Sequence, residues 1–158
     1  MTRILVTSDT HGYYAPISDY ILSRNDIDLL IHAGDGVEDV ISIAYETQIP
    51  YYVVRGNNDY YTNEAYDKVI EKDGIKIFLT HGHHYGVYGG SGEVFDKARQ
   101  NNCQIAIYGH THIYKNEEID GIIILNPGSV SLPRDNNPGF MLMDIENGQI
   151  KLERVKVE

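Results

Sequence analysis

With 158 residues, the chain is long enough to bury a core of its own, and we expect residues 1–158 to form one domain. Its formal net charge is -10, from 23 acidic and 13 basic side chains, which argues against binding to long nucleic acid because such binding depends on clustered Lys and Arg. The lone Cys103 excludes an intrachain disulfide and a cysteine-rich zinc site, and it fits a reducing cytoplasm.

The first half of the chain alternates short apolar runs with segments of helical spacing. The apolar runs, which predict buried strands, are residues 3–8, 28–33 and 51–54. Between them, the segment that begins at Pro16 and the segment 37–45 have the apolar spacing of helices, and Pro16 suits a first helical turn. This alternation predicts parallel pairing of the strands with right-handed crossovers.

Three pairs of runs in the second half flank turn sequences that are typical of β-hairpins. The pairs are 66–70 with 75–79, 115–119 with 122–126, and 139–145 with 149–155, around Asp73-Gly74, Asp120-Gly121 and Asn147-Gly148. A glycine-rich loop at 86–92 precedes a short helix at 93–101 and a strand at 105–108. We expect this half to be largely antiparallel, and the whole chain to form two sheets packed face to face with helices outside.

Side chains that can bind metal follow five of the predicted strands, at the point where each strand ends. The five segments are Asp9-Thr10-His11, Gly34-Asp35, Gly56-Asn57-Asn58-Asp59, His81-Gly82-His83 and Gly109-His110-Thr111-His112. Residues two apart at the end of a strand point to the same side, so each His–X–His pair can direct two imidazoles to one spot. Imidazole is a common ligand of transition metals, and the five segments together predict one metal site.

Each segment also has a purely structural interpretation when it is taken alone. Asp9 and Asp35 could cap the helices that follow them, and the segment after Gly56 could be an ordinary turn. His32 is best explained as a hydrogen-bonded interior histidine. Two His–X–His pairs are harder to explain by packing, and their combination with the acidic segments favours the metal site.

A mixed set of nitrogen and oxygen ligands suits Mn, Fe, Co, Ni or Zn. Two such ions about 3.5–4 Å apart can hold a bridging hydroxide as the nucleophile and bind a phosphoryl oxygen, which is a route to the hydrolysis of phosphate esters. The sequence has no Ser–His–Asp arrangement on a Gly–X–Ser–X–Gly elbow and no Walker-type loop, so it does not indicate serine or P-loop chemistry.

In this order, the five segments resemble the calcineurin-like metallophosphoesterase family. Together with Asn126-Pro127-Gly128-Ser129, they are most similar to its small single-domain phosphodiesterases of the YfcE type. The resemblance implies an α/β fold of the αββα sandwich class, with two mixed β-sheets packed face to face and flanking helices. It also implies a dinuclear metal centre at the C-terminal ends of the strands.

The resemblance assigns seven metal ligands to this chain. Asp9, His11 and His112 would hold the first ion, Asn57, His81 and His110 the second, and Asp35 would bridge the two. His83 would lie beside them. Manganese is our first choice for the two divalent ions, with Ni, Fe, Zn and Mg as alternatives.

One position departs from the family pattern. Many members carry a histidine directly after the ligand asparagine, where it acts on the leaving group, whereas this chain has Asn58, which cannot donate a proton as an imidazolium does. The candidate catalytic set is Asn58, His83 and Asp59. Of these, Asp59 would orient the histidine that is missing here. We expect a slow enzyme that favours good leaving groups, unless His83 or His84 substitutes.

The leading hypothesis is a metal-dependent phosphodiesterase that hydrolyses a small phosphodiester by attack of a hydroxide bridging two metal ions. Arg55 and Arg134 are candidate phosphate contacts. A second hypothesis is a catalytically weak or inactive protein-binding scaffold, because the family includes a retromer subunit of this kind. A third is a phosphomonoesterase or nuclease. Every ligand position is filled, which favours an enzyme.

No apolar run approaches the roughly 20 residues of a membrane span, and Met1 leads straight into the first predicted strand without the pattern of a signal peptide. We therefore expect a cytoplasmic protein that makes no contact with a membrane. A homo-oligomer stays open, because exposed tyrosines and apolar residues could serve a dimer interface although nothing in the sequence requires one.

Overall fold

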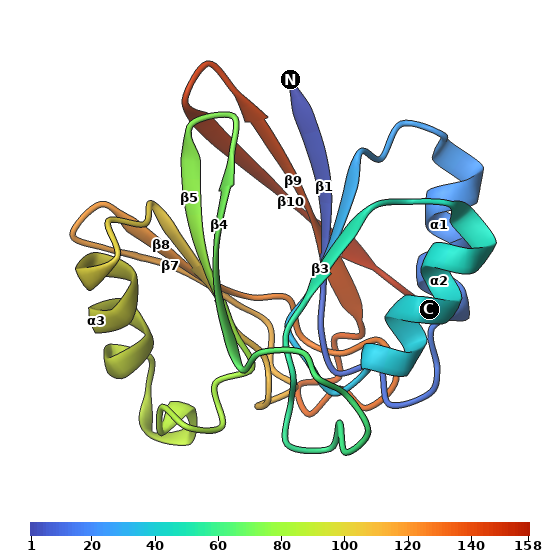
Figure 1. Ribbon diagram of the computed structural model, residues 1–158, viewed down its shortest axis with the longest axis horizontal. Coiled ribbons are helices and arrows are strands. Elements are labelled where there is room, and N and C mark those ends of the chain that lie inside the picture. The colour runs from blue at the N-terminus through green and yellow to red at the C-terminus, as the bar shows by residue number, and fades with distance from the viewer.

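Two five-stranded sheets form the centre of the computed structural model, which describes residues 1–158 (Figure 1). In sheet order, the first contains β10 (Gln149–Lys156), β9 (Gly139–Glu146), β1 (Thr2–Thr7), β2 (Leu29–His32) and β3 (Tyr51–Val53). The second contains β4 (Asp67–Lys72), β5 (Ile75–Thr80), β6 (Ile105–Ile107), β8 (Ile122–Asn126) and β7 (Lys115–Ile119).

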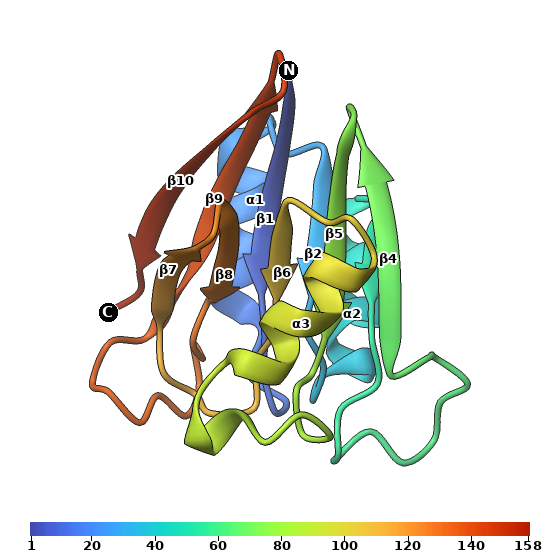
Figure 2. The same cartoon turned by 90° about the vertical axis from the view of Figure 1, so that its left-hand side faces the viewer.

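The helices lie on the outer faces of the two sheets, as Figures 1 and 2 show. α1 (Ala15–Arg24) and α2 (Val37–Thr47) cover the first sheet, and α3 (Gly92–Gln100) covers the second. The layers therefore run helix, sheet, sheet, helix, and the predicted αββα sandwich of two mixed sheets is confirmed. None of the helices is long and apolar enough to cross a membrane.

The side chains of each strand alternate between the two faces of its sheet. This alternation gives the core three apolar layers, one between the sheets and one under the helices on each side. In β1, Ile4 and Val6 belong to the cluster between the sheets, whereas Leu5 packs under α1 and α2. In β5, Ile77 belongs to the same central cluster and Phe78 packs under α3. Successive residues of a strand point to opposite faces, so these continuous apolar runs are buried on both sides.

The strand pairing agrees with the prediction in the first half and differs from it in the second. β1, β2 and β3 are parallel, as predicted. The second half of the chain was expected to be largely antiparallel: its three hairpins are antiparallel, but β6 pairs in parallel with both β5 and β8. The hairpin sequences encode β4–β5 and β7–β8 correctly, whereas the pairing between hairpins depends on crossovers such as α3 that no local turn specifies.

All three predicted hairpin turns are confirmed by their backbone angles. The first turn residues, Asp73, Asp120 and Asn147, have φ of 50°, 49° and 51°, and the glycine that follows each also has a positive φ. This is the geometry that two-residue hairpin turns require. The 86–92 segment, expected to be a loop, contains a short 3₁₀ turn at Val87–Gly89, which forms because the Val87 side chain is buried in the core under α3.

Candidate metal centre

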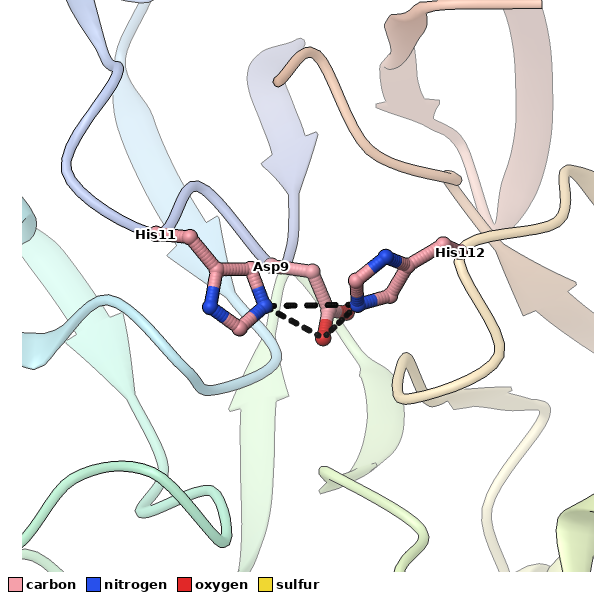
Figure 3. A group of neighbouring side chains, drawn as sticks. All are labelled: Asp9, His11 and His112. Carbon is pink, nitrogen blue, oxygen red and sulfur yellow. Dashed lines mark hydrogen bonds and ion pairs between the residues drawn. The ribbon is translucent and has the colours of Figure 1, made fainter. Parts of the chain in front are cut away.

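The C-terminal ends of strands from both sheets meet at one edge of the sandwich, the lower edge in Figure 1. Asp9 and Asp35 follow β1 and β2 of the first sheet, and His81 and His110 follow β5 and β6 of the second. Parallel strands bring their carboxyl ends to the same edge, which is why segments far apart in the sequence converge here. Figure 3 shows Asp9, His11 and His112 pointing toward one another at this edge.

The backbone at these strand ends is held in a sparsely populated conformation. Five of the seven predicted ligands have positive φ, namely Asp9 (54°), His11 (46°), Asp35 (60°), His110 (71°) and His112 (60°). Other non-glycine residues of the chain with positive φ lie in turns, bends and helix ends. Such angles cost free energy in L-residues and persist only where the surroundings enforce them, which is typical of functional sites.

The Asp9 carboxylate lies at the centre of the cluster. Its Oδ1 atom is 3.2 Å from Nε2 of His112 and 3.7 Å from Nε2 of both His11 and His81. Asp9 is fully buried, and Oδ1 receives no hydrogen bond, whereas Oδ2 accepts one from the backbone N–H of His110 at 2.9 Å. A buried carboxylate oxygen without a donor is costly, and a cation beside it would remove that cost.

Asp35 joins the two halves of the cluster. Its Oδ2 atom lies 3.4 Å from Nε2 of His81 and 3.6 Å from Nε2 of His11. Nδ1 of His110 is 3.2 Å from the same His81 nitrogen. Two groups therefore have the spacing that metal ligands require, Asp9 with His11 and His112, and Asp9 with Asp35 and His81. Carboxylate oxygens and imidazole nitrogens are the donors that first-row divalent ions accept.

Hydrogen bonds behind the cluster orient two of its imidazoles. Nδ1 of His81 is 2.8 Å from the carbonyl oxygen of Ala33, and Nδ1 of His112 is 2.8 Å from that of Leu132. A carbonyl oxygen only accepts, so Nδ1 carries the proton in both rings and the Nε2 lone pair faces the cluster. This arrangement fits metal binding by Nε2.

The electrostatics of the cluster favour ionised carboxylates. Burial alone would raise the pKa of Asp9, but interactions with His11 and the charge of His81 lower it below its usual range. Burial also opposes ionisation of Asp35, yet interactions with His81 lower its pKa to about 2. The nearby Asp9 carboxylate raises the pKa of His11. Two ionised carboxylates in a buried site attract a cation.

The segment after β3 supplies neighbours to Asp35. Asn58 donates from its backbone N–H to Oδ1 of Asp35 at 2.8 Å and from its side-chain amide to Oδ2 at 2.9 Å. Asn57 is exposed, and its side chain makes no hydrogen bond within the molecule. The structure therefore brings six of the seven predicted ligands together, and the role of Asn57 as a ligand stays a prediction.

Asp59 lies behind the cluster rather than in it. Its carboxylate accepts four backbone hydrogen bonds, from Asp35 and Gly56 at 2.8 Å, from Gly36 at 3.0 Å and from Val37 at 3.1 Å. Both oxygens are therefore occupied at the N-terminal end of α2. In this structure Asp59 is a positioning residue for the Asp35 loop.

His83 lies beside the cluster. Its ring centroid is 5.3 Å from that of His81 and 4.0 Å from that of His84, and its Nδ1 atom is buried without a hydrogen-bond partner. Burial, together with the charges of His84 and His81, lowers the pKa of His83 to about 4. The ring is therefore neutral at neutral pH and carries an unshared nitrogen near the ligands.

The two candidate phosphate contacts already have partners. Arg55 donates from Nε to the backbone oxygen of Asp59 at 2.9 Å. Arg134 donates from Nη1 to the hydroxyl of Tyr88 at 2.7 Å, and the Tyr88 ring lies 4.9 Å from that of His110. Arg134 is thus connected to the predicted ligand His110 through the ring of Tyr88.

Several supporting residues were missed by sequence reasoning or noted only through the family resemblance. The fully buried Asn126 donates to the backbone oxygen of Gly109 at 3.1 Å and to the Thr111 hydroxyl at 3.0 Å, and the Ser129 hydroxyl donates to the backbone oxygen of Asp9 at 2.8 Å. Their signal in the sequence is the segment Asn126-Pro127-Gly128-Ser129, which follows an apolar run and belongs to the family resemblance.

A second network, beneath the Asp9–His11 loop, is built on His32. The ring accepts from the Gly34 N–H at 3.0 Å and contacts the Thr10 hydroxyl at 3.0 Å, and that hydroxyl donates to Asp39 at 2.6 Å. Asp39 also accepts from the Gly12 N–H at 2.8 Å. The interpretation of His32 as a hydrogen-bonded interior histidine is confirmed. Thr10 and Asp39 carried no sequence signal for this role.

Two glycines are required by close approach of the loops. A Cβ atom at Gly109 would collide with the side chains of Ser8 and Asp9, and one at Gly56 would collide with Asp35. Glycine at these positions lets the ligand loops from different strands touch one another.

A pocket of about 510 Å³ adjoins the cluster. It lies between the N-terminal end of α2 and residues 58–62, and its inner wall includes His11, Asp35 and Asn58. A substrate bound at the cluster can therefore extend into this pocket.

Comparison with known proteins agrees with the fold and identifies the family. The family sequence model described as "Calcineurin-like phosphoesterase superfamily domain" matches residues 2–148 of this chain. A Mycoplasma pneumoniae protein named "Probable metallophosphoesterase" is 33% identical over 158 residues, covering 95% of this chain and 94% of its own. A phosphodiesterase of Methanocaldococcus jannaschii is 28% identical over 167 residues, covering 94% of this chain and 96% of its own.

Solved structures show the same fold. A predicted phosphoesterase of Streptococcus pneumoniae superposes with a TM-score of 0.84 at 26% identity, covering 98% of this chain and 89% of its own. Vps29 from Entamoeba histolytica, solved with Zn²⁺, superposes with a TM-score of 0.79 at 26% identity, covering 98% of this chain and 99% of its own.

Proposed function

This chain belongs to the calcineurin-like phosphoesterase superfamily, and from this premise we propose that it is a phosphodiesterase that uses two divalent metal ions to hydrolyse a small phosphodiester. The observation that carries the proposal is the buried Oδ1 atom of Asp9, which has no hydrogen-bond donor and faces three imidazole nitrogens at 3.2–3.7 Å. No protein group donates to this oxygen, and a cation beside it would balance the charge of the carboxylate.

In the proposal, Asp9, His11 and His112 hold one ion, and His81, His110 and Asn57 hold the other. Asp35 contacts both groups and is assigned as the bridging ligand. When bound, two divalent ions supply Lewis-acid activation of the attacking water and of the phosphoryl oxygen. Manganese stays our first choice; the Zn²⁺ bound by the Entamoeba Vps29 makes zinc the alternative to test beside it, together with Ni, Fe and Mg.

The other residues have supporting roles. Asn58 holds both oxygens of Asp35, and Asp59 fixes the backbone on which Asp35 is carried. Neither can act as a general acid here, because one is an amide and the other has both oxygens occupied. His83 is a neutral imidazole beside the cluster, and we assign it to contact with the substrate.

A diester is favoured over a monoester. The M. jannaschii relative is named as a phosphodiesterase. The residue after Asn57 is not a histidine, so poor leaving groups receive no proton from that position. A small diester also fits the acidic chain better than a long nucleic acid does, and the proposed location is the cytoplasm.

A specific observation also supports a second function, that of a protein-binding scaffold, because Vps29 has the same fold over nearly the whole chain. The two functions differ in their dependence on the cluster. A phosphodiesterase requires the ionised carboxylates and the imidazoles, whereas a scaffold does not require metal-dependent turnover.

The test is the hydrolysis of bis-p-nitrophenyl phosphate and p-nitrophenyl phosphate by metal-stripped protein, with Mn, Ni, Mg or Zn added back. We expect turnover of the diester to return with metal and to fall at least 100-fold in Asp35→Ala and His110→Ala. Asp96→Asn, on the exposed face of α3, is the matched control and should keep full activity. Absence of turnover of both esters with every metal would favour the scaffold.

A further inference from the structure

The pocket beside the metal cluster has an apolar, aromatic outer wall. Its inner end is formed by His11 and Asp35, and its outer end by Ile41, Tyr60 and Tyr61. Tyr60 is 68% exposed and Tyr61 93% exposed, although both are large side chains with an apolar ring. They lie in the loop between β3 and β4, at the edge where the strand ends converge (Figure 1). Exposed aromatic rings beside a catalytic cleft provide stacking surface for a ligand.

The volume of the pocket fits an organic group of moderate size. Small-molecule sites in proteins usually have about 300–1,000 Å³, and this pocket has about 510 Å³. A methyl or ethyl ester would leave most of that volume to water. A nucleoside or an aryl group would fill it and would reach the tyrosines from a phosphate at the cluster.

The charges on the pocket wall are of one sign. Its 13 residues include four carboxylates and no Lys or Arg. Asp35 and Asp59 are occupied by hydrogen bonds, and Asp39 accepts from Thr10 and Gly12. Glu38 is exposed and forms neither a hydrogen bond nor an ion pair. An additional phosphate in this pocket would meet an uncompensated negative charge.

The N-terminal end of α2 faces the same pocket, but a carboxylate of this chain already occupies part of it. A helix N-terminus ordinarily attracts phosphate through its free N–H groups and its dipole. Here Oδ1 of Asp59 already accepts from the N–H groups of Gly36 and Val37, at 3.0 and 3.1 Å. Glu38 and Asp39 in the first turn add further negative charge. The pocket therefore offers aromatic surface and no Lys or Arg, and the N–H groups of Gly36 and Val37 are already bonded to Asp59.

We propose that this pocket is the specificity site of the enzyme: it binds an uncharged nucleoside group of the phosphodiester and rejects substrates with a second phosphate on that group. The proposal rests on the proposed function, because it requires the scissile phosphate to lie at the metal cluster. Tyr60 and Tyr61 supply the stacking surface, and Glu38 supplies the repulsion.

Three esters with the same leaving group provide the test. They are methyl p-nitrophenyl phosphate, the p-nitrophenyl ester of thymidine 5′-phosphate, and the same thymidine ester with a 3′-phosphate. We expect kcat/KM for the thymidine ester to exceed that for the methyl ester at least tenfold. The 3′-phosphate should lower kcat/KM of the thymidine ester at least tenfold. In the Tyr60→Ala/Tyr61→Ala double variant, the ratio of kcat/KM for the thymidine ester to that for the methyl ester should fall toward one. Glu38→Lys should raise kcat/KM for the 3′-phosphorylated ester back to that of its parent.

Tyr45→Ala is the matched control, because Tyr45 is 82% exposed on α2 but does not line the pocket. It should leave the activities and their ratios unchanged. Equal rates for the methyl and thymidine esters, or a 3′-phosphorylated ester as fast as its parent, would overturn the proposal. Failure of all three esters with every metal would instead remove the proposed function on which it rests.

A binding measurement gives a readout that does not depend on turnover. Thymidine 5′-methyl phosphate, a diester with a poor leaving group, is titrated into protein with ¹³C-labelled tyrosine rings. Signals of Tyr60 and Tyr61, assigned with single Tyr→Phe variants, should shift, while that of Tyr45 should not. Shifts spread equally over all three rings, or absent from Tyr60 and Tyr61, would contradict a thymidine site in this pocket.

Discussion

Several side chains near the metal cluster act on the backbone rather than on a ligand. His32 accepts from the Gly34 N–H, and Asp59 accepts from four N–H groups. Asn126 donates to the backbone oxygen of Gly109 and accepts from the Gly128 N–H. Ligand loops with positive φ are unfavourable for L-residues. These contacts fix the loops in that conformation, so the imidazoles and carboxylates are held at metal-binding distance before any ligand arrives.

His32 gives a prediction for the pH dependence of stability. Burial lowers its pKa to about 4, against about 6.5 in the unfolded chain, so between these values the unfolded state binds more protons. Its contribution is complete above pH 6.5 and is lost as the pH falls toward 4. Between pH 7.5 and pH 5.0 the metal-free wild type should lose about 2 kcal/mol more stability than His32→Gln, measured by urea unfolding.

The comparison between wild type and His32→Gln removes the effect of other titrating groups, including His11, whose pKa is raised and whose contribution changes in the opposite direction. The expected signal is thus a difference between two slopes and not the absolute stability of either protein. Parallel pH profiles would show that His32 takes up a proton in the folded state without penalty, contrary to its full burial.

At the scale of elements, the N-terminal end of α2 depends on a residue from another loop. α2 has Gly36 at its N-cap and no capping side chain of its own, and Asp59 supplies the missing acceptor. Asp59→Ala would leave four N–H groups without this partner and is expected to destabilise the protein by about 2 kcal/mol. It should also weaken Mn²⁺ binding, because the Asp35 N–H is one of the four. Urea unfolding and metal titration measure the two effects.

Asp96→Ala on α3 is the control for this experiment, since its carboxylate is exposed and its only ion pair is with Arg99 at 3.6 Å. Surface pairs of this kind contribute little to stability. If the two alanine variants were equally stable and bound Mn²⁺ equally well, the connection between Asp59, α2 and Asp35 would be unimportant, and the assignment of Asp59 as a positioning residue would be wrong.

The elements were predictable where the information is local. The Asp-Gly and Asn-Gly turns require positive φ and specify the hairpins, and the apolar runs of β1 and β5 specify strands buried on both faces. The parallel pairing of β6 was not predictable, because it depends on how α3 returns the chain. The five ligand segments were visible as motifs. The roles of Thr10 and Asp39 were not, because only the tertiary structure brings them to His32.

At the scale of the whole molecule, the cluster joins the two sheets. Asp9 and Asp35 come from the first sheet, and His81 and His110 from the second, so a bound ion would be a link between the two halves of the sandwich. Without a cation, two ionised carboxylates lie together in a chain of net charge -10. Binding of metal to the folded state alone would therefore stabilise the fold as a whole.

The last prediction measures that link. At a Mn²⁺ concentration of about 100 times Kd, the gain in stability should be about 2.7 kcal/mol, and for a chain of this size the Tm should rise by about 5–10 °C. Asp9→Asn keeps the shape of the side chain but removes the charge that faces three imidazoles, so it should lose most of this rise, whereas Asp96→Asn should keep it. Differential scanning fluorimetry with and without metal gives both values. A rise of the same size in Asp9→Asn would place the bound ion elsewhere on the molecule, because Oδ1 of Asp9 is the buried carboxylate oxygen that lacks a hydrogen-bond donor and faces the imidazoles.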